Sequence, residues 1–236
     1  MLGFFDPLYL IMIAPVLILA FIAQWMVKSR FNWASKIAAR MTGAQAARRI
    51  LDSNGLQDVQ VEAVSGHLSD HYDPRTKVVR LSHQVYGDHS MAAVGIAAHE
   101  VGHALQDARN YAPLVIRNAA VPLAGFGGNI GSIFLMIGMV MLISGLAPLG
   151  KIAMLAGIVL FGATVVFQLI NLPVEFNASS RAKTELVSLG IVGGHELSAV
   201  SKVLNAAALT YVAATLQAVV TLLYYVIRYS QLSSRD

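Results

Sequence analysis

The sequence predicts a mainly α-helical integral membrane protein, with about four transmembrane helices and a small α+β unit in the cytoplasm. Hydrophobic residues make up 56% of the chain and charged residues only 13%, whereas a soluble domain carries roughly 25% charged residues. Four long segments contain no charged side chain, and a helix needs only about 20 apolar residues to cross the hydrocarbon core. These uncharged segments are residues 7–27, 118–150, 152–174 and 203–227.

We place the transmembrane helices near residues 7–27, 121–146, 152–172 and 205–227. The first is not a cleaved signal peptide, because Asp6 precedes it and Lys28 and Arg30 follow it. A signal peptide carries its positive charges at the opposite end, so we expect an uncleaved anchor whose N-terminus lies outside. In the second helix, the spacing of Gly127 and Gly131 indicates close helix packing rather than a nucleotide-binding loop.

The basic residues predict how the chain is oriented, because cytoplasmic loops of membrane proteins are enriched in Lys and Arg. Most of the 17 Lys and Arg residues lie in segments 28–117 and 174–203, and the opposite side holds only Lys151, Arg228 and Arg235. We therefore expect a multi-pass protein of the cell membrane, embedded in the lipid bilayer, with both polar segments in the cytoplasm. A role in binding nucleic acid is excluded, because the sequence has no basic stripe with interleaved aromatic residues.

The first polar segment contains short elements that precede the most informative motif of the chain. They are an amphipathic helix over 42–51, a strand over 59–64, a turn over 73–76 and a strand over 77–82. Thr42 is a good N-cap for the helix, which should end near Asn54. Alternating apolar residues indicate the strand pair. An edge strand of such a pair can hold an extended peptide by main-chain hydrogen bonds.

The motif is His99-Glu100-Val101-Gly102-His103, in a segment that Ser90 can cap and that contains no helix breaker. Residues four apart share one face of a helix, so His99 and His103 can bind one ion. Glu100 is then close enough to reach a water molecule bound to that ion. This arrangement is typical of zinc-dependent hydrolases, and a chance occurrence or a pair of core histidines explains it less well.

A catalytic zinc site needs a third protein ligand and an open position. The chain has no cysteine, so the ligand is His, Asp or Glu. The candidates are Glu175, Glu185, Glu196 and His195 in the second polar segment, and His67, His71, His83 and His89 before the motif. We favour Glu175, because Pro173 suits a first helical turn; an acidic residue there also fits simple stabilisation of a helix start. Glu185 and Glu196 look like ordinary exposed charges.

The chain resembles known zinc peptidases at these residues. HEVGHA is similar to the motif of the gluzincin peptidases, and Glu175–Ser179 to the E-x-x-A-D of the Ste24 and HtpX membrane peptidases, with Ser179 at the Asp. Four stretches, 66–74, 99–106, 173–179 and 204–213, resemble the YugP-like membrane zinc metallopeptidase family. The resemblance implies a gluzincin-like cytoplasmic unit in which Glu175 is the downstream ligand of one zinc ion.

These features predict a membrane-bound zinc-dependent endopeptidase that acts on peptides or membrane proteins. His99, His103 and Glu175 would bind Zn²⁺, and Glu100 would take a proton from water and pass it to the leaving amine. An oxyanion must also be stabilised. The candidates for this are His67 and His71, the latter in a turn between the strands, with Arg181 and Tyr211, although each also suits packing or anchoring.

Two other functions compete with this prediction. A non-catalytic zinc-binding scaffold or adaptor would close its metal site with four protein ligands. A transporter would be expected to place charged side chains inside the membrane, and the four predicted spans have none. The intact motif with a downstream carboxylate therefore favours the enzyme.

Overall fold

The computed structural model describes residues 6–233, which fold into seven helices and three strands arranged in two compact units. The helical unit contains residues 6–22, 116–172 and 211–233 of the described chain. The second unit, here called the site unit, contains residues 23–115 and 173–210. The chain is mainly helical, as the sequence predicts.

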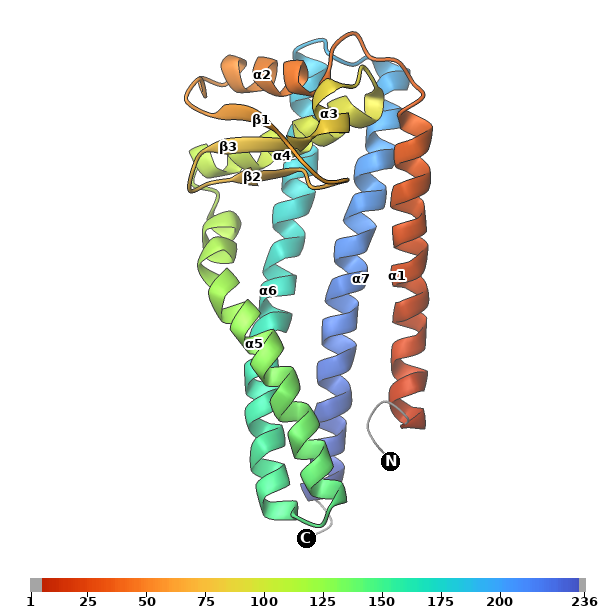
Figure 1. Ribbon diagram of the computed structural model, residues 1–236, viewed down its shortest axis with the longest axis vertical. Helices are drawn as coiled ribbons and strands as arrows, with labels where there is room; N and C mark the ends of the chain where they lie inside the picture. Colours follow the sequence, from red (N-terminus) through yellow and green to blue (C-terminus); the bar gives the residue numbers. More distant parts are fainter. Residues whose placement is uncertain (1–5, 234–236) are drawn as a thin grey trace. The chain divides into compact units, whose positions relative to one another are not determined.

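Four helices are long and apolar enough to cross a membrane (Figure 1). They are α1 (Pro7–Ala34), α5 (Ala112–Ile143), α6 (Ala147–Ser188) and α7 (Gly194–Ser233). Helices α1, α6 and α7 each contain a predicted span, and α5 covers the predicted span 121–146 up to Ile143, so the prediction of four long apolar helices is confirmed. The helices extend well beyond the apolar segments. In α6 and α7 the polar extensions belong to the site unit, where they bury Leu186 and Val200.

Close backbone approach and one partly buried ion pair stabilise the helical unit. A Cβ atom at Gly127 would lie 2.4 Å from the carbonyl oxygen of Leu160, which confirms the predicted close packing of α5, here against α6. The start of α1 is tied to the end of α7, because Asp6 accepts hydrogen bonds from the Tyr224 hydroxyl and from Arg228. The two chain ends of the described helical unit therefore lie together.

The site unit contains a three-stranded sheet of β1 (Gln60–Val64), β2 (His71–Asp73) and β3 (Val78–Ser82), in the order β1-β3-β2. Strand β3 pairs parallel with β1 and antiparallel with β2. The two predicted strands are confirmed, but the assignment of His71 to a turn is wrong, because it begins β2. A strand of three residues is too short to show alternation in sequence.

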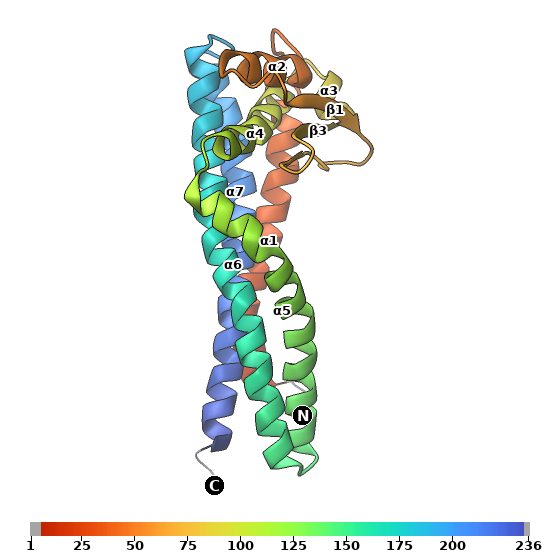
Figure 2. The ribbon, with the colours of Figure 1, turned by 90° about the vertical axis from the view of Figure 1, so that its left-hand side faces the viewer.

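Helix α4 (Met91–Ala108) runs through the centre of the site unit, and most of its residues are buried. Helix α2 (Gly43–Ser53) packs on it, and α3 (His83–Gly87) joins it to β3 (Figure 2). The predicted caps are confirmed: Thr42 and Gln45 form a capping box for α2, and the Ser90 hydroxyl accepts from the Ala93 amide of α4. The hydrophobic core of the unit includes Ile50, Leu81, Val101, Leu186 and Val200.

Candidate metal centre

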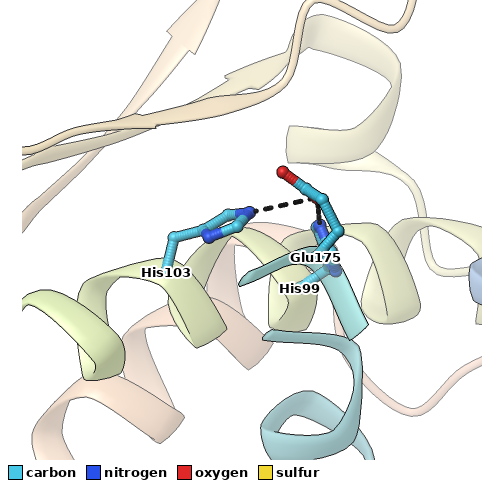
Figure 3. A group of neighbouring side chains, drawn as sticks. All are labelled: His99, His103 and Glu175. Atoms are coloured by element: carbon cyan, nitrogen blue, oxygen red, sulfur yellow. Dashed lines mark ion pairs between the residues drawn. The ribbon is translucent and has the colours of Figure 1, made fainter. Parts of the chain in front are cut away.

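The structure brings His99, His103 and Glu175 together inside the site unit (Figure 3). The Nε2 atoms of His99 and His103 lie 3.3 Å and 3.5 Å from the same carboxylate oxygen, Oε2 of Glu175. One potential ligand atom from each residue lies within 4.8 Å of the others. Residues 72 positions apart in the chain, His103 and Glu175, therefore present their donor atoms to one point.

The two histidines lie one helical turn apart on α4, as the motif spacing predicts. Their rings meet edge to face, with centroids 4.9 Å apart and an interplanar angle of 84°. This leaves the two Nε2 atoms aimed at Glu175 rather than at each other. The pair is largely buried, with side chains 12% and 9% exposed, so bulk water does not compete strongly for these nitrogens.

Glu175 lies in the interior of α6, and the expectation that it sits in a first helical turn is wrong. Helix α6 runs without a break from Ala147 to Ser188 and contains Pro173. Proline removes one backbone hydrogen bond from a helix interior, but apolar helices tolerate this because neighbouring groups compensate. Stabilisation of a helix start therefore does not explain Glu175, which leaves its contacts with the histidines.

The α4–α6 contact that aligns these residues depends on Gly102, inside the motif. A Cβ atom at this position would lie 2.5 Å from the carbonyl oxygen of Ala178, three residues after Glu175. Contacts below 3.0 Å are sterically forbidden, so only glycine permits this approach of the two backbones. The glycine thus brings the helix of the two histidines within reach of the helix of the glutamate.

The donor set fits a divalent zinc ion. Oε2 of Glu175 is buried and has no hydrogen-bond partner among the described residues, although it faces two imidazole nitrogens at ion-pair distance. A buried carboxylate oxygen without a partner is costly, and a cation between the three groups would remove that cost. Two nitrogens and one carboxylate oxygen are ligands that zinc takes, and three protein ligands leave the fourth position open.

Each imidazole also has a hydrogen-bonding partner at its second ring nitrogen, Nδ1. Nδ1 of His99 lies 3.0 Å from the Ser179 hydroxyl, and Nδ1 of His103 lies 3.0 Å from Oε1 of Gln106. Such contacts orient metal-binding histidines so that the other ring nitrogen faces the ion. Ser179, which stands where the Ste24 and HtpX pattern has Asp, is therefore the partner of His99.

Glu100 lies beside the cluster in a buried position. Burial raises the pKa of this carboxyl to about 7, and the backbone amide of Tyr72 in β2 opposes the rise by donating a hydrogen bond to it. The Tyr72 hydroxyl donates to Asp107 at 2.9 Å, so one residue of β2 contacts α4 at two points. A carboxylate whose pKa is near neutrality is well suited to exchange protons at pH 7.

His67 and His71, the two histidines proposed to stabilise the oxyanion, lie outside the cluster of metal ligands and have contacts of their own. Side chains alternate along a strand: Tyr72 faces α4, so His71 faces the other side of the sheet, opposite Arg80. Its Nδ1 contacts the Ser69 carbonyl oxygen at 2.8 Å. His67 is exposed and lies edge to face with Phe31, at 5.7 Å between centroids.

Arg181 and Tyr211, the other two candidates for stabilising the oxyanion, are also not part of the cluster of metal ligands. The Nε atom of Arg181 donates to Asn177 at 2.7 Å, and its guanidinium lies over the ring of Tyr111 at 5.7 Å. Tyr211 lies in α7 and belongs to the helical unit. The contacts of Asn177, Gln106 and Tyr72 around the motif were not predicted; the sequence signal for each was its position within one of the stretches 173–179, 99–106 and 66–74.

The remaining acidic candidates for the third ligand have partners of their own. Glu185 accepts a hydrogen bond from the Asn54 amide at 3.0 Å, and Glu196 accepts from the Gly193 backbone amide at 2.7 Å, at the start of α7. Among the described residues, the cluster of three or more potential metal ligands is the one formed with Glu175.

The four long apolar helices and the His-His-Glu cluster together define a membrane protein with a candidate zinc site. Comparison with known proteins agrees with this class. The model of a family described as "Putative neutral zinc metallopeptidase" matches residues 9–230, so the chain belongs to this family of zinc metallopeptidases. It is 48% identical over 231 residues to "Putative membrane protease YugP" of Bacillus subtilis, covering 97% of this chain and 99% of that protein. No solved structure matches.

Proposed function

We propose that the protein is a zinc-dependent endopeptidase of the membrane, with zinc held by His99, His103 and Glu175. The observation that carries the proposal is the convergence of two imidazole nitrogens on one unpartnered carboxylate oxygen, beside buried Glu100. When bound, zinc would lower the pKa of a water molecule and polarise the scissile carbonyl group.

Glu100 performs the proton transfers in this proposal. Its carboxylate takes a proton from the attacking water and delivers it to the nitrogen of the leaving amine. The Tyr72 backbone amide holds the carboxylate, while Tyr72 itself is anchored to Asp107. Burial excludes bulk water from Glu100 and keeps its pKa close to the working pH.

Strand β2 is the proposed binding surface for the substrate backbone. It lies at one end of the sheet order, and its Tyr72 amide donates to Glu100. An extended peptide that pairs with this edge gains main-chain hydrogen bonds and places a peptide bond near the general base. This mode of binding favours extended peptides and unstructured segments of membrane proteins as substrates.

We propose His67, a candidate that lies in the site unit, as the group that stabilises the oxyanion. Arg181 is engaged with Asn177, and His71 faces the far side of the sheet. A donor of this kind raises kcat without contributing to zinc binding. We therefore expect His67→Ala to slow cleavage at full zinc occupancy.

The site unit is proposed to lie in the cytoplasm, as the distribution of Lys and Arg predicts. The relative from Bacillus subtilis is described as a "putative membrane protease". The four apolar helices of this chain are long enough to cross the bilayer. Substrates would then be cleaved on the inner side of the membrane.

A non-catalytic zinc scaffold is the competing function. A structural zinc site is closed by four protein ligands, whereas the cluster within residues 6–233 offers three. A scaffold would also leave Glu100 without a role, although the burial of this carboxyl has a cost in free energy. Both observations favour the peptidase.

The substitution Glu100→Gln tests the proposal directly. The purified variant should bind zinc as the wild type does, measured by elemental analysis, but should not cleave fluorescently labelled casein. Glu62→Gln, which alters an exposed carboxylate of β1, is the control and should retain both properties. Cleavage by the Glu100→Gln variant at the wild-type rate would exclude the mechanism.

A further inference from the structure

Gln106 is a completely buried polar side chain that contacts His103 at Nδ1, the ring nitrogen that does not face Glu175. Its relative exposure is 0%. Its Oε1 lies 3.0 Å from Nδ1 of His103, and its Nε2 donates to the Val174 carbonyl oxygen at 2.8 Å and to Asn177 Oδ1 at 3.0 Å. A buried amide is tolerated only when its polar atoms have partners, and here both ends of the amide are engaged.

These contacts determine which way the amide faces. A backbone carbonyl oxygen can only accept, so the Val174 oxygen requires the amide nitrogen of Gln106. The amide oxygen must then face His103, and Nδ1 of His103 must carry the proton that this oxygen accepts. In a neutral imidazole, Nε2 is consequently unprotonated, and it is the nitrogen that faces Glu175 at 3.5 Å.

Asn177 and Arg181 extend the same network by one layer. Arg181 can only donate, and its Nε reaches Oδ1 of Asn177 at 2.7 Å. The Asn177 oxygen therefore faces both Arg181 and the amide nitrogen of Gln106. The orientation of Gln106 is thus fixed twice, by the Val174 carbonyl and by the Asn177 oxygen.

The amide also connects the two helices that carry the ligands. Gln106 follows His103 by less than one turn of α4, and Val174 directly precedes Glu175 in α6. One side chain therefore contacts the ring of one ligand and the backbone next to another. A shift of α4 along α6 would break at least one of its hydrogen bonds.

We propose that Gln106 is a positioning residue for the zinc site: it holds His103 in the tautomer that presents Nε2 and fixes the register of α4 against α6. The inference rests on the proposed zinc-binding function of His103 and Glu175. Gln106 itself touches neither the ion nor the substrate, and it acts through the ring that it orients.

The experiment measures the tautomer of His103 in metal-free, full-length protein in detergent micelles, by nitrogen NMR after ¹⁵N-histidine labelling. Gln106→Met keeps the length of the side chain and removes its hydrogen bonds. Gln106→Glu keeps an acceptor for His103, and Gln84→Met changes an exposed glutamine of α3 as the matched control. Zinc affinity is measured on the same samples by competition with a chelator.

We expect the Nδ1 of His103 to be protonated in the wild type, in Gln106→Glu and in the Gln84→Met control. Gln106→Met should give a mixture of tautomers and bind zinc about 10- to 100-fold more weakly, the usual effect of losing such a partner. His99, whose partner is Ser179, should keep its tautomer in every variant and so serves as the internal reference.

Two results would overturn the proposal. One is a wild-type His103 protonated at Nε2, which needs no variant and holds even if Gln106→Met does not fold. The other is an unchanged tautomer together with unchanged zinc affinity in folded Gln106→Met. A wild type that binds no zinc but shows the predicted tautomer would refute the proposed function and leave the orientation of His103 by Gln106 standing.

Discussion

Gly102 lies directly against Ala178, so that a Cβ atom at position 102 would stand 2.5 Å from the Ala178 carbonyl oxygen. A backbone carbonyl in a helix has no freedom to move aside, unlike the end of a flexible side chain. The contact therefore determines how closely the helix of His99 and His103 approaches the helix of Glu175.

The substitution Gly102→Ala should force α4 and α6 apart. Overpacking of this kind costs about 1–3 kcal/mol of stability, and the separation should also weaken zinc binding, because the ligands lie on different helices. Thermal unfolding and zinc titration measure the two effects. Gly125→Ala, where the added carbon meets nothing within 4 Å, is the control; equal behaviour of the two variants would argue against the contact.

Removal of Glu175 should abolish most of the stabilisation that zinc provides. A ligand that binds only the folded state stabilises it by about 2.7 kcal/mol at a free concentration 100 times its Kd. We expect added zinc to raise the Tm of the wild type and of Glu185→Ala, but much less that of Glu175→Ala. A zinc-dependent shift that is equal in all three proteins would remove Glu175 from the ligand set.

The substitution Tyr72→Phe should impair cleavage without affecting zinc. It removes the hydrogen bond to Asp107 that ties β2 to α4, a loss of about 1 kcal/mol, while leaving the metal ligands intact. We expect a lower kcat/KM for casein with full zinc occupancy. Tyr86→Phe, at an exposed tyrosine of α3, should behave as the wild type; reduced zinc binding in Tyr72→Phe would contradict the assigned role.

The orientation of the chain can be measured with single cysteines, because the natural sequence contains none. Arg75→Cys places a thiol in the exposed turn between β2 and β3, and Ser144→Cys places one in the turn between α5 and α6. A thiol reagent that does not cross membranes should label position 144 in intact cells and position 75 only after lysis. The reverse pattern would place the site unit outside.

The sequence was most informative where one local rule determines the structure. Uncharged length predicted the four long helices, side-chain capping predicted the starts of α2 and α4, and the spacing of His99 and His103 predicted their shared face. Strand β2 escaped prediction because three residues cannot show a period. Its place in the sheet is determined instead by pairing with β3.

Contacts between distant segments account for what could not be predicted at the site. Pro173 suggested a helix start, but α6 tolerates it in its interior. Gln106 acquires its role only when Val174, 68 residues later, comes within hydrogen-bond distance. No local pattern reports such a contact, since it depends on how α4 packs against α6.

The order in which the chain is synthesised also limits when the centre can exist. His99 and His103 leave the ribosome well before Glu175, with the whole of α5 and the apolar part of α6 between them. A nascent or truncated chain that ends before α6 therefore lacks the third donor. The three-residue centre can therefore assemble only after synthesis has passed Glu175.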